Sequence, residues 1–491
     1  MRQLGGLQPL DNRGFFLLLG VIIASAVLMR VPRLTVAPDW NTGDYAQYVM
    51  HAANLVEGRP FEETGYIYNP DYASLAPRAY PPGYPVLLAP VYAVFDGEMV
   101  PMRLLTLALF AACLLVAGLL FRRHLSPSLA LAGVALVGLN PQVQSLALEV
   151  TSDVPFLLFL LLGLTSLETR SPDDSVGRSL LVGVILFIPF SIRTIGGLLP
   201  VSLVLASLWR SRRVGRGTLI SLGCFASLVV ALSFWTTGSA SYLDQLTPSL
   251  ATFFSNAVAY SQDFSAFWDP GWDDTVAGEW VRKVFTLLTM VVITVGLLSE
   301  LRRGATTKDF FVVLYVVVVL TWPAYQGARF LVPVFPLACL YLLLGARALS
   351  DMARSAVAGR ATLAFATVVP FAFYVGSFVA PADATARLPV DDAPSRALHD
   401  FLRETPEDAV VVFAKPRVLS LMTGRRAVAN HQPDADEELL AFFRDVGATY
   451  VVLGPEELGR REYLEGFVER NASLFDRVFV NERFTVFRIG E

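Results

Sequence analysis

Long hydrophobic runs separated by short polar loops dominate the first 380 residues of this chain. Runs long enough to cross a bilayer core of about 30 Å as helices occur at 14–33, 99–121, 127–145, 152–169, 217–236, 279–300, 308–326, 328–348 and 360–380. Another apolar stretch, 178–209, is roughly twice the length of one span and contains Pro189, Arg193, Gly196, Gly197 and Pro200. Because proline interrupts a helix, this stretch is predicted to form two short helices that meet at a break. The pattern therefore predicts a polytopic α-helical membrane protein with about 11 transmembrane helices.

The basic loops predict how the spans are oriented in the membrane. Arginine and lysine gather at 122–124, 170–178, 210–216, 302–308 and 347–360. With eleven spans, these loops and the N-terminus fall on one side, which the positive-inside rule identifies as cytoplasmic. The first span is followed by no small-residue cleavage site and is expected to be a retained anchor. We therefore predict a multi-pass protein of the cell membrane (plasma or inner membrane) with its N-terminus in the cytoplasm.

Two polar regions lie on the predicted external side. In loop 34–98, the segment DYAQYVMHAANLV has apolar residues at helical spacing and is predicted to form an amphipathic helix in the membrane interface. The run YPPGYPVLLAPVYAVF is predicted to be a second interfacial element at the mouth of a cavity. After about residue 385, helical and strand patterns alternate as in a soluble domain. We therefore predict a transmembrane domain, 1–384, that includes the loop, and an external α/β domain, 385–491.

Composition narrows the class of protein. Hydrophobic residues make up 54% of the 491 residues and charged residues only 17%, and the mean hydropathy is +0.52. A soluble domain has about a quarter charged residues, so most of this chain is expected to face lipid. The net charge of −4 and the scattered basic loops argue against nucleic-acid binding. The three cysteines, Cys113, Cys224 and Cys339, lie inside apolar runs and form no metal or disulfide motif.

Carboxylates in the external regions are candidate catalytic or metal-binding residues. Asp44 begins the first predicted interfacial helix, where it suits a general base; the alternative is a helix cap, together with Asn41 and Thr42. Asp153 begins the fourth span and follows Glu149, and carboxylates at the edge of hydrocarbon are costly unless paired or functional. Capping is again the alternative for Asp153. If Asp44 and Asp153 converge, with Glu149 as a further ligand, their oxygens suit Mg²⁺ or Mn²⁺ beside a phosphate.

Cations complete the set of candidates. Arg193 and Arg329 lie within or beside apolar segments, where an arginine usually faces a cavity, a partner or an anionic ligand. Guanidinium binds phosphate through two hydrogen bonds; the alternative is a structural ion pair or a contact with lipid head groups. Arg78 is a further candidate cation, unless it is a solvated loop residue. A lone histidine, His51, is more typical of a structural role, and the basic cluster Lys415, Arg417, Arg425 and Arg426 of a solvated face.

Four segments carry a family resemblance. In chain order they are GDYAQYVMHAANLVEGRPF followed by YPPGYPVLL, then LNPQVQSLALEVTSDVPFLLFLLLGL, then SIRTIGGLLP, and then GARFLVPVFPLACL. They resemble the GT-C superfamily of membrane glycosyltransferases, in the bacterial branch related to protein O-mannosyltransferases and the aminoarabinose transferase of lipid A. The resemblance runs through most of residues 10–380. It implies a GT-C-like fold and a sugar donor carried on a polyprenyl phosphate, with inversion at the anomeric carbon.

The resemblance also assigns residues. It makes Asp44 the acidic residue of the first external loop, Tyr48 the aromatic position after it, Asp153 the acidic residue of the fourth span, and Arg329 the arginine before an LLP-like segment. The chain departs from the family pattern twice. It has Asp44-Tyr45 in place of Asp-Glu, and Tyr80, itself a candidate for substrate binding, in place of a histidine or lysine before Pro-Pro. Arg78 or Arg193 is expected to compensate for the missing cation.

These observations predict an inverting glycosyltransferase that moves a sugar from a polyprenyl-phosphate donor to an acceptor hydroxyl on the external face. The acceptor is a glycan, a lipid or a protein. A transporter or flippase for a lipid-linked sugar is the alternative, because it shares broken helices and buried arginines. Transporters usually have two similar halves, and the hydropathy of this chain shows no such repeat. A non-catalytic scaffold, in which Asp44 and Asp153 tolerate substitution, is a third possibility.

Overall fold

The computed structural model describes residues 11–72, 77–168, 174–235, 249–268, 276–323, 325–353, 355–379 and 387–490. The chain divides into two compact units. The helical unit takes the described parts of Met1–Leu34, Arg103–Trp235 and Leu246–Pro381. The mixed unit takes the described parts of Thr35–Met102 and Ala382–Glu491. The loop after the first helix thus forms a compact unit together with the C-terminal segment.

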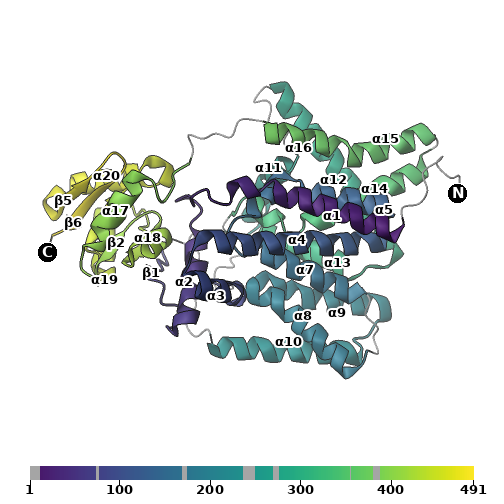
Figure 1. The fold of residues 1–491 in the computed structure, drawn as a ribbon, viewed down its shortest axis with the longest axis horizontal. Coiled ribbons are helices and arrows are strands. Elements are labelled where there is room, and N and C mark those ends of the chain that lie inside the picture. Colours follow the sequence, from purple (N-terminus) through teal and green to yellow (C-terminus); the bar gives the residue numbers. More distant parts are fainter. Residues whose placement is uncertain are drawn as a thin grey trace. The chain divides into compact units, whose positions relative to one another are not determined.

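Helices joined by turns make up the described part of the helical unit (Figure 1). They are α1 (Asn12–Leu28), α4 (Met99–His124), α5 (Pro127–Gly138), α6 (Pro141–Leu146), α7 (Asp153–Glu168), α8 (Val176–Ile192), α9 (Leu198–Ser211), α10 (Arg216–Trp235), α11 (Leu250–Ala266), α12 (Val276–Gly304), α13 (Thr307–Thr321), α14 (Phe335–Met352), α15 (Ala356–Thr367) and α16 (Val369–Val379). Each run predicted as a span contains a helix. Helix α11 lies between the predicted spans 217–236 and 279–300 and was not predicted.

Several of these helices have the length and composition of membrane spans. Among the described residues, seven helical stretches are long and apolar enough to cross a bilayer. Shorter apolar helices at Gly83–Phe95, Pro127–Gly138 and Val176–Ile192 fall below that length. The chain is therefore a polytopic, multi-pass helical membrane protein. The total of eleven spans and the cytoplasmic N-terminus stay predictions.

Small residues allow the closest helix packing in this unit. A Cβ added to Gly296 of α12 would lie 2.0 Å from the Tyr341 carbonyl oxygen of α14. A Cβ added to Gly345 of α14 would lie 2.0 Å from the Val292 carbonyl oxygen of α12. The two backbones therefore touch directly, as is common where small residues line helix contacts in membranes.

The break predicted within 178–209 is present. Helix α8 ends at Ile192, Arg193 is extended with φ −144° and ψ 127°, and a short 3₁₀ helix, η2 (Thr194–Gly197), leads into α9. A Cβ on Gly196 would lie 2.6 Å from the Phe190 nitrogen, so only glycine fits where the turn folds back on α8. The break places the Arg193 side chain at the end of α8.

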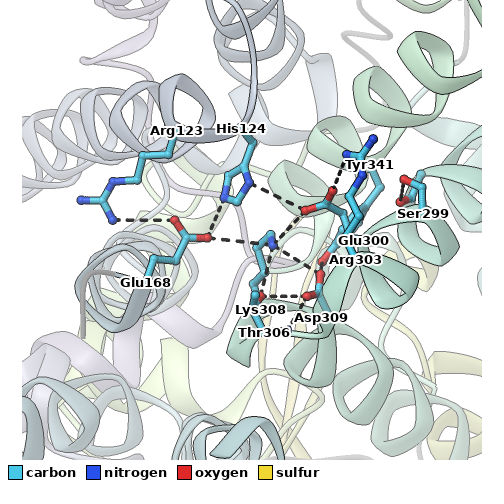
Figure 2. Close-up of polar contacts among 11 residues, drawn as sticks. Arg123, His124, Glu168, Ser299, Glu300, Arg303, Thr306, Lys308, Asp309 and Tyr341 are labelled. Atoms are coloured by element: carbon cyan, nitrogen blue, oxygen red, sulfur yellow. Dashed lines mark hydrogen bonds and ion pairs between the residues drawn. The ribbon is translucent and has the colours of Figure 1, made fainter. Parts of the chain in front are cut away.

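A network of charges joins one end each of α4, α7, α12 and α13 in the helical unit, and a tyrosine of α14 bonds to it (Figure 2). Lys308, at the start of α13, is fully buried and lies 3.5 Å from carboxylate oxygens of both Glu300 and Asp309. His124, at the end of α4, lies 2.6 Å from Glu168 of α7, and Tyr341 of α14 donates to Asp309 at 2.6 Å. Buried charges persist only when they are paired, and here each carboxylate has a cationic or hydroxyl partner. The network therefore fixes these helix ends to one another.

The mixed unit is built around one sheet. Its helices are α2 (Asp44–Glu57), α3 (Gly83–Phe95), α17 (Ala393–Arg403), α18 (Pro416–Thr423), α19 (Asp436–Val446) and α20 (Arg461–Arg470), and its strands are β1 (Tyr66–Ile67), β2 (Val410–Val412), β3 (Arg426–Val428), β4 (Tyr450–Leu453), β5 (Phe475–Val480) and β6 (Thr485–Ile489). The strand order is β1-β3-β2-β4-β6-β5. The first four strands are parallel, and β6 and β5 are antiparallel. The Val-rich strand β2 is buried on both faces, as expected of a central parallel strand.

The opening loop contributes to this sheet and its core. Strand β1, from loop 34–98, pairs with β3 in the register Tyr66 to Ala427. Trp40, fully buried, donates its indole hydrogen to Ser395 Oγ at 2.9 Å. The loop and the C-terminal segment thus share hydrogen bonds and apolar contacts. The predicted division into a transmembrane domain, 1–384, and an external domain, 385–491, stays a prediction.

Candidate functional site

Asp44 lies at the first position of α2, where side chains from two distant segments reach it. The residue before it, Gly43, provides no side-chain cap, so Asp44 is a helical residue rather than the cap of the helix. Asp44 Oδ1 accepts a hydrogen bond from the Tyr80 hydroxyl at 2.8 Å and lies 2.9 Å from Arg417 Nη1. Its side chain is 23% exposed. The carboxylate is therefore oriented by its neighbours and still reachable from outside.

Two predicted substrate-binding tyrosines lie beside this carboxylate. The rings of Tyr48 and Tyr80 stack with centroids 4.6 Å apart, and Tyr84 meets Tyr48 edge-on at 5.1 Å. Tyr48 is four residues after Asp44 on α2, which places both on one face of the helix. The structure therefore brings Asp44, Tyr48 and Tyr80 together, and their roles with substrate stay predictions.

Arg417 is the residue that the sequence analysis missed. Its guanidinium bonds to the hydroxyl of Tyr80 as well as to Asp44, and it lies 5.8 Å from the Tyr80 ring centroid and 5.9 Å from that of Tyr66. Burial lowers the pKa of Arg417, but Tyr80, Asp44 and Tyr66 together raise that pKa above its usual value. The side chain is only 12% exposed. Its assignment to a solvated face is therefore wrong.

One signal in the sequence points to Arg417. The run Lys415-Pro416-Arg417 follows the buried strand β2 and opens α18. In parallel sheets, functional side chains gather where strands end and helices begin. A cation at such a turn is a candidate for a site even when its neighbours in the sequence are solvated.

A buried polar stripe on α2 holds the loop that carries Tyr80. Gln47 Nε2 donates to the Arg78 carbonyl at 2.5 Å, His51 contacts the Phe61 carbonyl at 2.7 Å, and Asn54 Nδ2 donates to the Glu63 carbonyl at 2.8 Å. All three side chains are buried. Helix α2 is thus enclosed from Tyr45 to Asn54. The prediction of a helix is confirmed, and its place in the membrane interface stays a prediction.

His51 is a positioning residue in its neutral form. Its Nδ1 faces the Phe61 carbonyl, which only accepts, so Nδ1 carries the proton. Its Nε2 therefore accepts a hydrogen bond from the Tyr80 backbone N–H, at 3.2 Å. Burial lowers the pKa of His51 to about 4, despite its bond to Phe61. The structural role that the sequence analysis favoured for His51 fits these contacts.

We predict that stability falls as the pH is lowered from about 6.5 towards 4. In this range the unfolded chain binds a proton at His51, whose ordinary pKa is about 6.5, whereas the folded chain does not, because its pKa is about 4. The contribution of neutral His51 to the free energy of unfolding is fully present above pH 6.5. Its loss on acidification amounts to about 3 kcal/mol at most. Burial also lowers the pKa of His399 to about 4, which adds to the slope.

The check is the apparent melting temperature of the full chain between pH 7 and pH 4. His51→Gln and His399→Gln are each expected to flatten the profile relative to the wild type. A wild-type melting temperature that is constant over this range would contradict the prediction.

Arg78 does not join the Asp44 cluster through its side chain, which is exposed. Its backbone carbonyl accepts the hydrogen bond from Gln47. These features match the alternative given for Arg78, which is that it is a solvated loop residue. A role in substrate binding stays a prediction.

The helical unit contains the second set of candidates. Asp153, fully buried at the start of α7, lies 2.8 Å through Oδ1 from Arg193 Nη2 and 2.8 Å through Oδ2 from Arg329 Nε. Thr151 also donates to Oδ2, at 2.9 Å, and Arg193 Nε donates to Ser152 Oγ at 2.8 Å. The structure thus brings Asp153, Arg193 and Arg329 together, in the ion-pair geometry that was the alternative for the arginines.

This triad, defined as Asp153, Arg193 and Arg329, carries two guanidinium groups and one carboxylate. Arg193 lies 5.9 Å and 5.8 Å from the ring centroids of Phe156 and Phe330, and its side chain is 14% exposed. Arg329, on the 3₁₀ helix η4 (Ala328–Leu331), is 31% exposed. Two positive charges and one negative charge leave a formal excess of one positive charge. The triad therefore favours an anion as its next neighbour.

The residues of the triad do not fit a metal ion in this arrangement. Both oxygens of Asp153 contact a guanidinium, and these cations oppose a divalent ion. Glu149 lies half-buried before α7. In the part of the chain that the structure describes, no three His, Cys, Asp or Glu side chains are placed to hold a metal. Asp44 and Asp153 belong to different units, so their convergence, and the predicted Mg²⁺ or Mn²⁺, stay predictions.

Comparisons with known proteins agree with the predicted resemblance. The family described as dolichyl-phosphate-mannose-protein mannosyltransferase matches residues 79–236, which is less than half of the chain. No curated protein matches the sequence. The resemblance to GT-C membrane glycosyltransferases is confirmed by this match together with the solved structures that share the fold.

Two solved structures show that fold over nearly the whole chain. ArnT from Cupriavidus metallidurans, bound to undecaprenyl phosphate, is 14% identical, with a TM-score of 0.56 over 97% of this chain and 98% of that chain. The oligosaccharyltransferase AglB from Archaeoglobus fulgidus, in complex with an inhibitory peptide and a dolichol-phosphate, is 12% identical, with a TM-score of 0.54 over 94% of this chain and 72% of that chain. At these identities the likeness shows a common fold.

Proposed function

We propose that this protein is an inverting glycosyltransferase that uses a polyprenyl-phosphate-linked sugar and acts on the external face of the membrane. The observation that carries the proposal is the Asp44 carboxylate, oriented by Tyr80 and Arg417 at the start of α2. The shared fold supports it, because the solved structures of ArnT and AglB hold undecaprenyl phosphate and a dolichol-phosphate. The acceptor is a hydroxyl group on a glycan, a lipid or a protein.

Asp44 acts as the general base in this proposal. The acceptor hydroxyl gives its proton to the carboxylate, and its oxygen attacks the anomeric carbon of the sugar. The bond between that carbon and the phosphate oxygen breaks, and polyprenyl phosphate leaves with the electron pair. Because attack and departure occur on opposite sides of one carbon, the configuration inverts. Arg417 favours the charged form of Asp44, which is the form that accepts a proton.

Arg193 and Arg329 keep their proposed role as phosphate-binding residues of the helical unit. The excess positive charge of the triad and the partial exposure of Arg329 suit a lipid phosphate. Asp153 then holds both guanidinium groups in position. Arg329→Gln is expected to weaken polyprenyl phosphate binding, measured by titration of the lipid into purified protein.

The test of the function is mass spectrometry of cell-envelope lipids and glycans. Cells that lack the protein are expected to have one glycoconjugate short of a single sugar and to accumulate the polyprenyl-phosphate sugar. Cells that carry Asp44→Asn are expected to match the deletion. An envelope profile unchanged by the deletion would exclude the proposal. Complete glycoconjugates in the Asp44→Asn cells, with loss only in the deletion, would favour the transporter alternative.

A further inference from the structure

Helix α11 carries three polar side chains along one face. They are Asn256, Tyr260 and Asp263, and their spacing of four and three residues places them side by side on the helix surface. Asn256 and Tyr260 are buried, and Asp263 is half-buried. A buried amide or hydroxyl is costly unless it has a hydrogen-bond partner. All three side chains find such a partner outside their own helix.

The partners lie in the connection between α13 and η4, defined as residues 320–323 and 325–327. Asn256 holds the first end of this connection. Its Nδ2 donates to the carbonyl oxygens of Leu320, at 3.1 Å, and Trp322, at 2.7 Å. These carbonyls lie where α13 ends, and the last carbonyls of a helix lack partners within the helix. Asn256 therefore fixes the direction in which the chain leaves α13.

Tyr260 and Asp263 hold the second end of the connection. The backbone N–H of Gln326 donates to the Tyr260 hydroxyl at 3.2 Å. The Tyr325 hydroxyl donates to the Asp263 carboxylate, and each carboxylate oxygen lies 2.7 Å from it. The rings of Tyr260 and Tyr325 also meet, with centroids 5.2 Å apart. The connection is thus bound to α11 at both of its ends.

Arg329 of the triad follows the connection directly. Gly327 ends the connection with φ 73°, a left-handed conformation that favours glycine. Helix η4 then brings Arg329 Nε to 2.8 Å from Asp153 Oδ2. The next carbonyl, that of Phe330, accepts a hydrogen bond from the Tyr315 hydroxyl of α13 at 2.9 Å. The backbone is therefore fixed both before and after Arg329.

We infer that Asn256, Tyr260 and Asp263 are positioning residues, through which α11 holds Arg329 in the orientation that binds the lipid phosphate. They act through the backbone of the connection and not by contact with the phosphate. A binding group needs such support, because ordering a flexible segment at the moment of binding costs conformational entropy. The Arg329 side chain is 31% exposed, so surrounding side chains enclose it only in part. The inference rests on the proposed role of Arg329 in phosphate binding.

The test is titration of polyprenyl phosphate, and of the uncharged polyprenol, into the full chain in lipid nanodiscs. Asp263→Ala removes the acceptor of the Tyr325 hydroxyl and is expected to weaken polyprenyl phosphate binding by about 3–10-fold, the effect of one hydrogen bond. Asp263→Asn is expected to retain binding, because its amide oxygen still accepts. Asn256→Ala, which removes two hydrogen bonds, is expected to weaken binding by about 10-fold. Polyprenol binding is expected to stay unchanged in all three variants.

Two controls separate positioning from a general loss of structure. Ser261→Ala alters the same helix at an exposed side chain that donates to the Val258 carbonyl of α11 itself, and it is expected to have no effect. The second control repeats Asp263→Ala in the Arg329→Gln background. If α11 acts through Arg329, Asp263→Ala has no further effect on polyprenyl phosphate binding once the guanidinium is gone. A merely structural defect weakens binding by the same factor in both backgrounds and weakens polyprenol binding as well.

Equal polyprenyl phosphate affinity in Asp263→Ala, Asn256→Ala and the wild type would overturn the inference. So would equal losses from Asp263→Ala in the wild-type and Arg329→Gln backgrounds. A loss of binding in Arg329→Gln alone would keep its proposed role with phosphate and reject only the positioning by α11. Wild-type affinity in Arg329→Gln would reject that role and the inference with it. Sugar transfer is measured separately, so a failed transfer assay and a failed binding assay identify different errors.

Discussion

Asp44→Asn is expected to lower the turnover of sugar transfer by about 10²–10⁴-fold, the range for removal of a general base. Asparagine keeps the size of the side chain and still accepts the hydrogen bond from the Tyr80 hydroxyl. It does not take up the proton of the acceptor. The measurement is transfer of labelled sugar from a polyprenyl-phosphate donor by purified protein, under conditions in which donor binding is saturated.

Glu57→Gln is the matched control for this variant. Glu57 ends the same helix, α2, and its carboxylate has the same kinds of partner: it accepts from the Tyr92 hydroxyl at 3.2 Å and pairs with Arg59 at 2.7 Å. Its side chain is exposed, so the substitution is expected to leave both folding and transfer unchanged. Equal turnover in Asp44→Asn and the wild type would remove Asp44 from the role of base.

The helices of this protein follow closely from its sequence. Their hydrophobic runs and helical spacing predict α1, α4, α7 and α10, because a helix needs only local residues to satisfy its backbone. The break before α9 was also predictable, because Pro189 and Gly196 act on their immediate neighbours. Helix α11 was missed, because its sequence, LATFFSNAVAYSQDFSA, is less apolar than that of a span and lies in a polar loop.

The sheet was harder to predict than the helices. Strand β1 has two residues, and its partner in β3 lies about 360 positions away in the chain, so no local pattern marks it. The C-terminal segment also contains short elements, among them α18, β3 and β5, that are hard to predict from local patterns. Their formation depends on long-range pairing and burial, which outweigh local preference in short strands.

In the candidate site, too, the local features were predictable and the long-range contacts were not. The sequence identified Asp44, Asp153, Arg193 and Arg329 as individual residues, because charges beside apolar segments are unusual, and the family resemblance added Tyr48. It did not identify their partners. Arg417 and Asp44 are 373 positions apart, and only the shared fold of loop 34–98 and the C-terminal segment brings them together. The sequence therefore reveals chemical types better than it reveals contacts.

Asp153→Asn is expected to destabilise the helical unit by about 3 kcal/mol, near the lower end of the cost of breaking a buried ion pair. The amide carries no charge, so the guanidinium groups of Arg193 and Arg329 lose the carboxylate between them and repel each other. Partial exposure of Arg329 limits the cost, because water reaches that group. The measurement is the apparent melting temperature in detergent, with an expected fall of roughly 5–10 °C.

The pair of Glu279 and Lys283 on α12 provides the control for this prediction. The side chains are 49% and 58% exposed, and exposed ion pairs contribute about 0–1 kcal/mol. Glu279→Gln is therefore expected to leave the melting temperature nearly unchanged. If Asp153 acts as the shared counter-ion, the double variant Asp153→Asn with Arg329→Gln loses less stability than the sum of the single variants, because one of the two unpaired cations is gone. Additive losses, or an Asp153→Asn protein as stable as the wild type, would show that Asp153 is not a structural counter-ion and would favour a direct role with substrate.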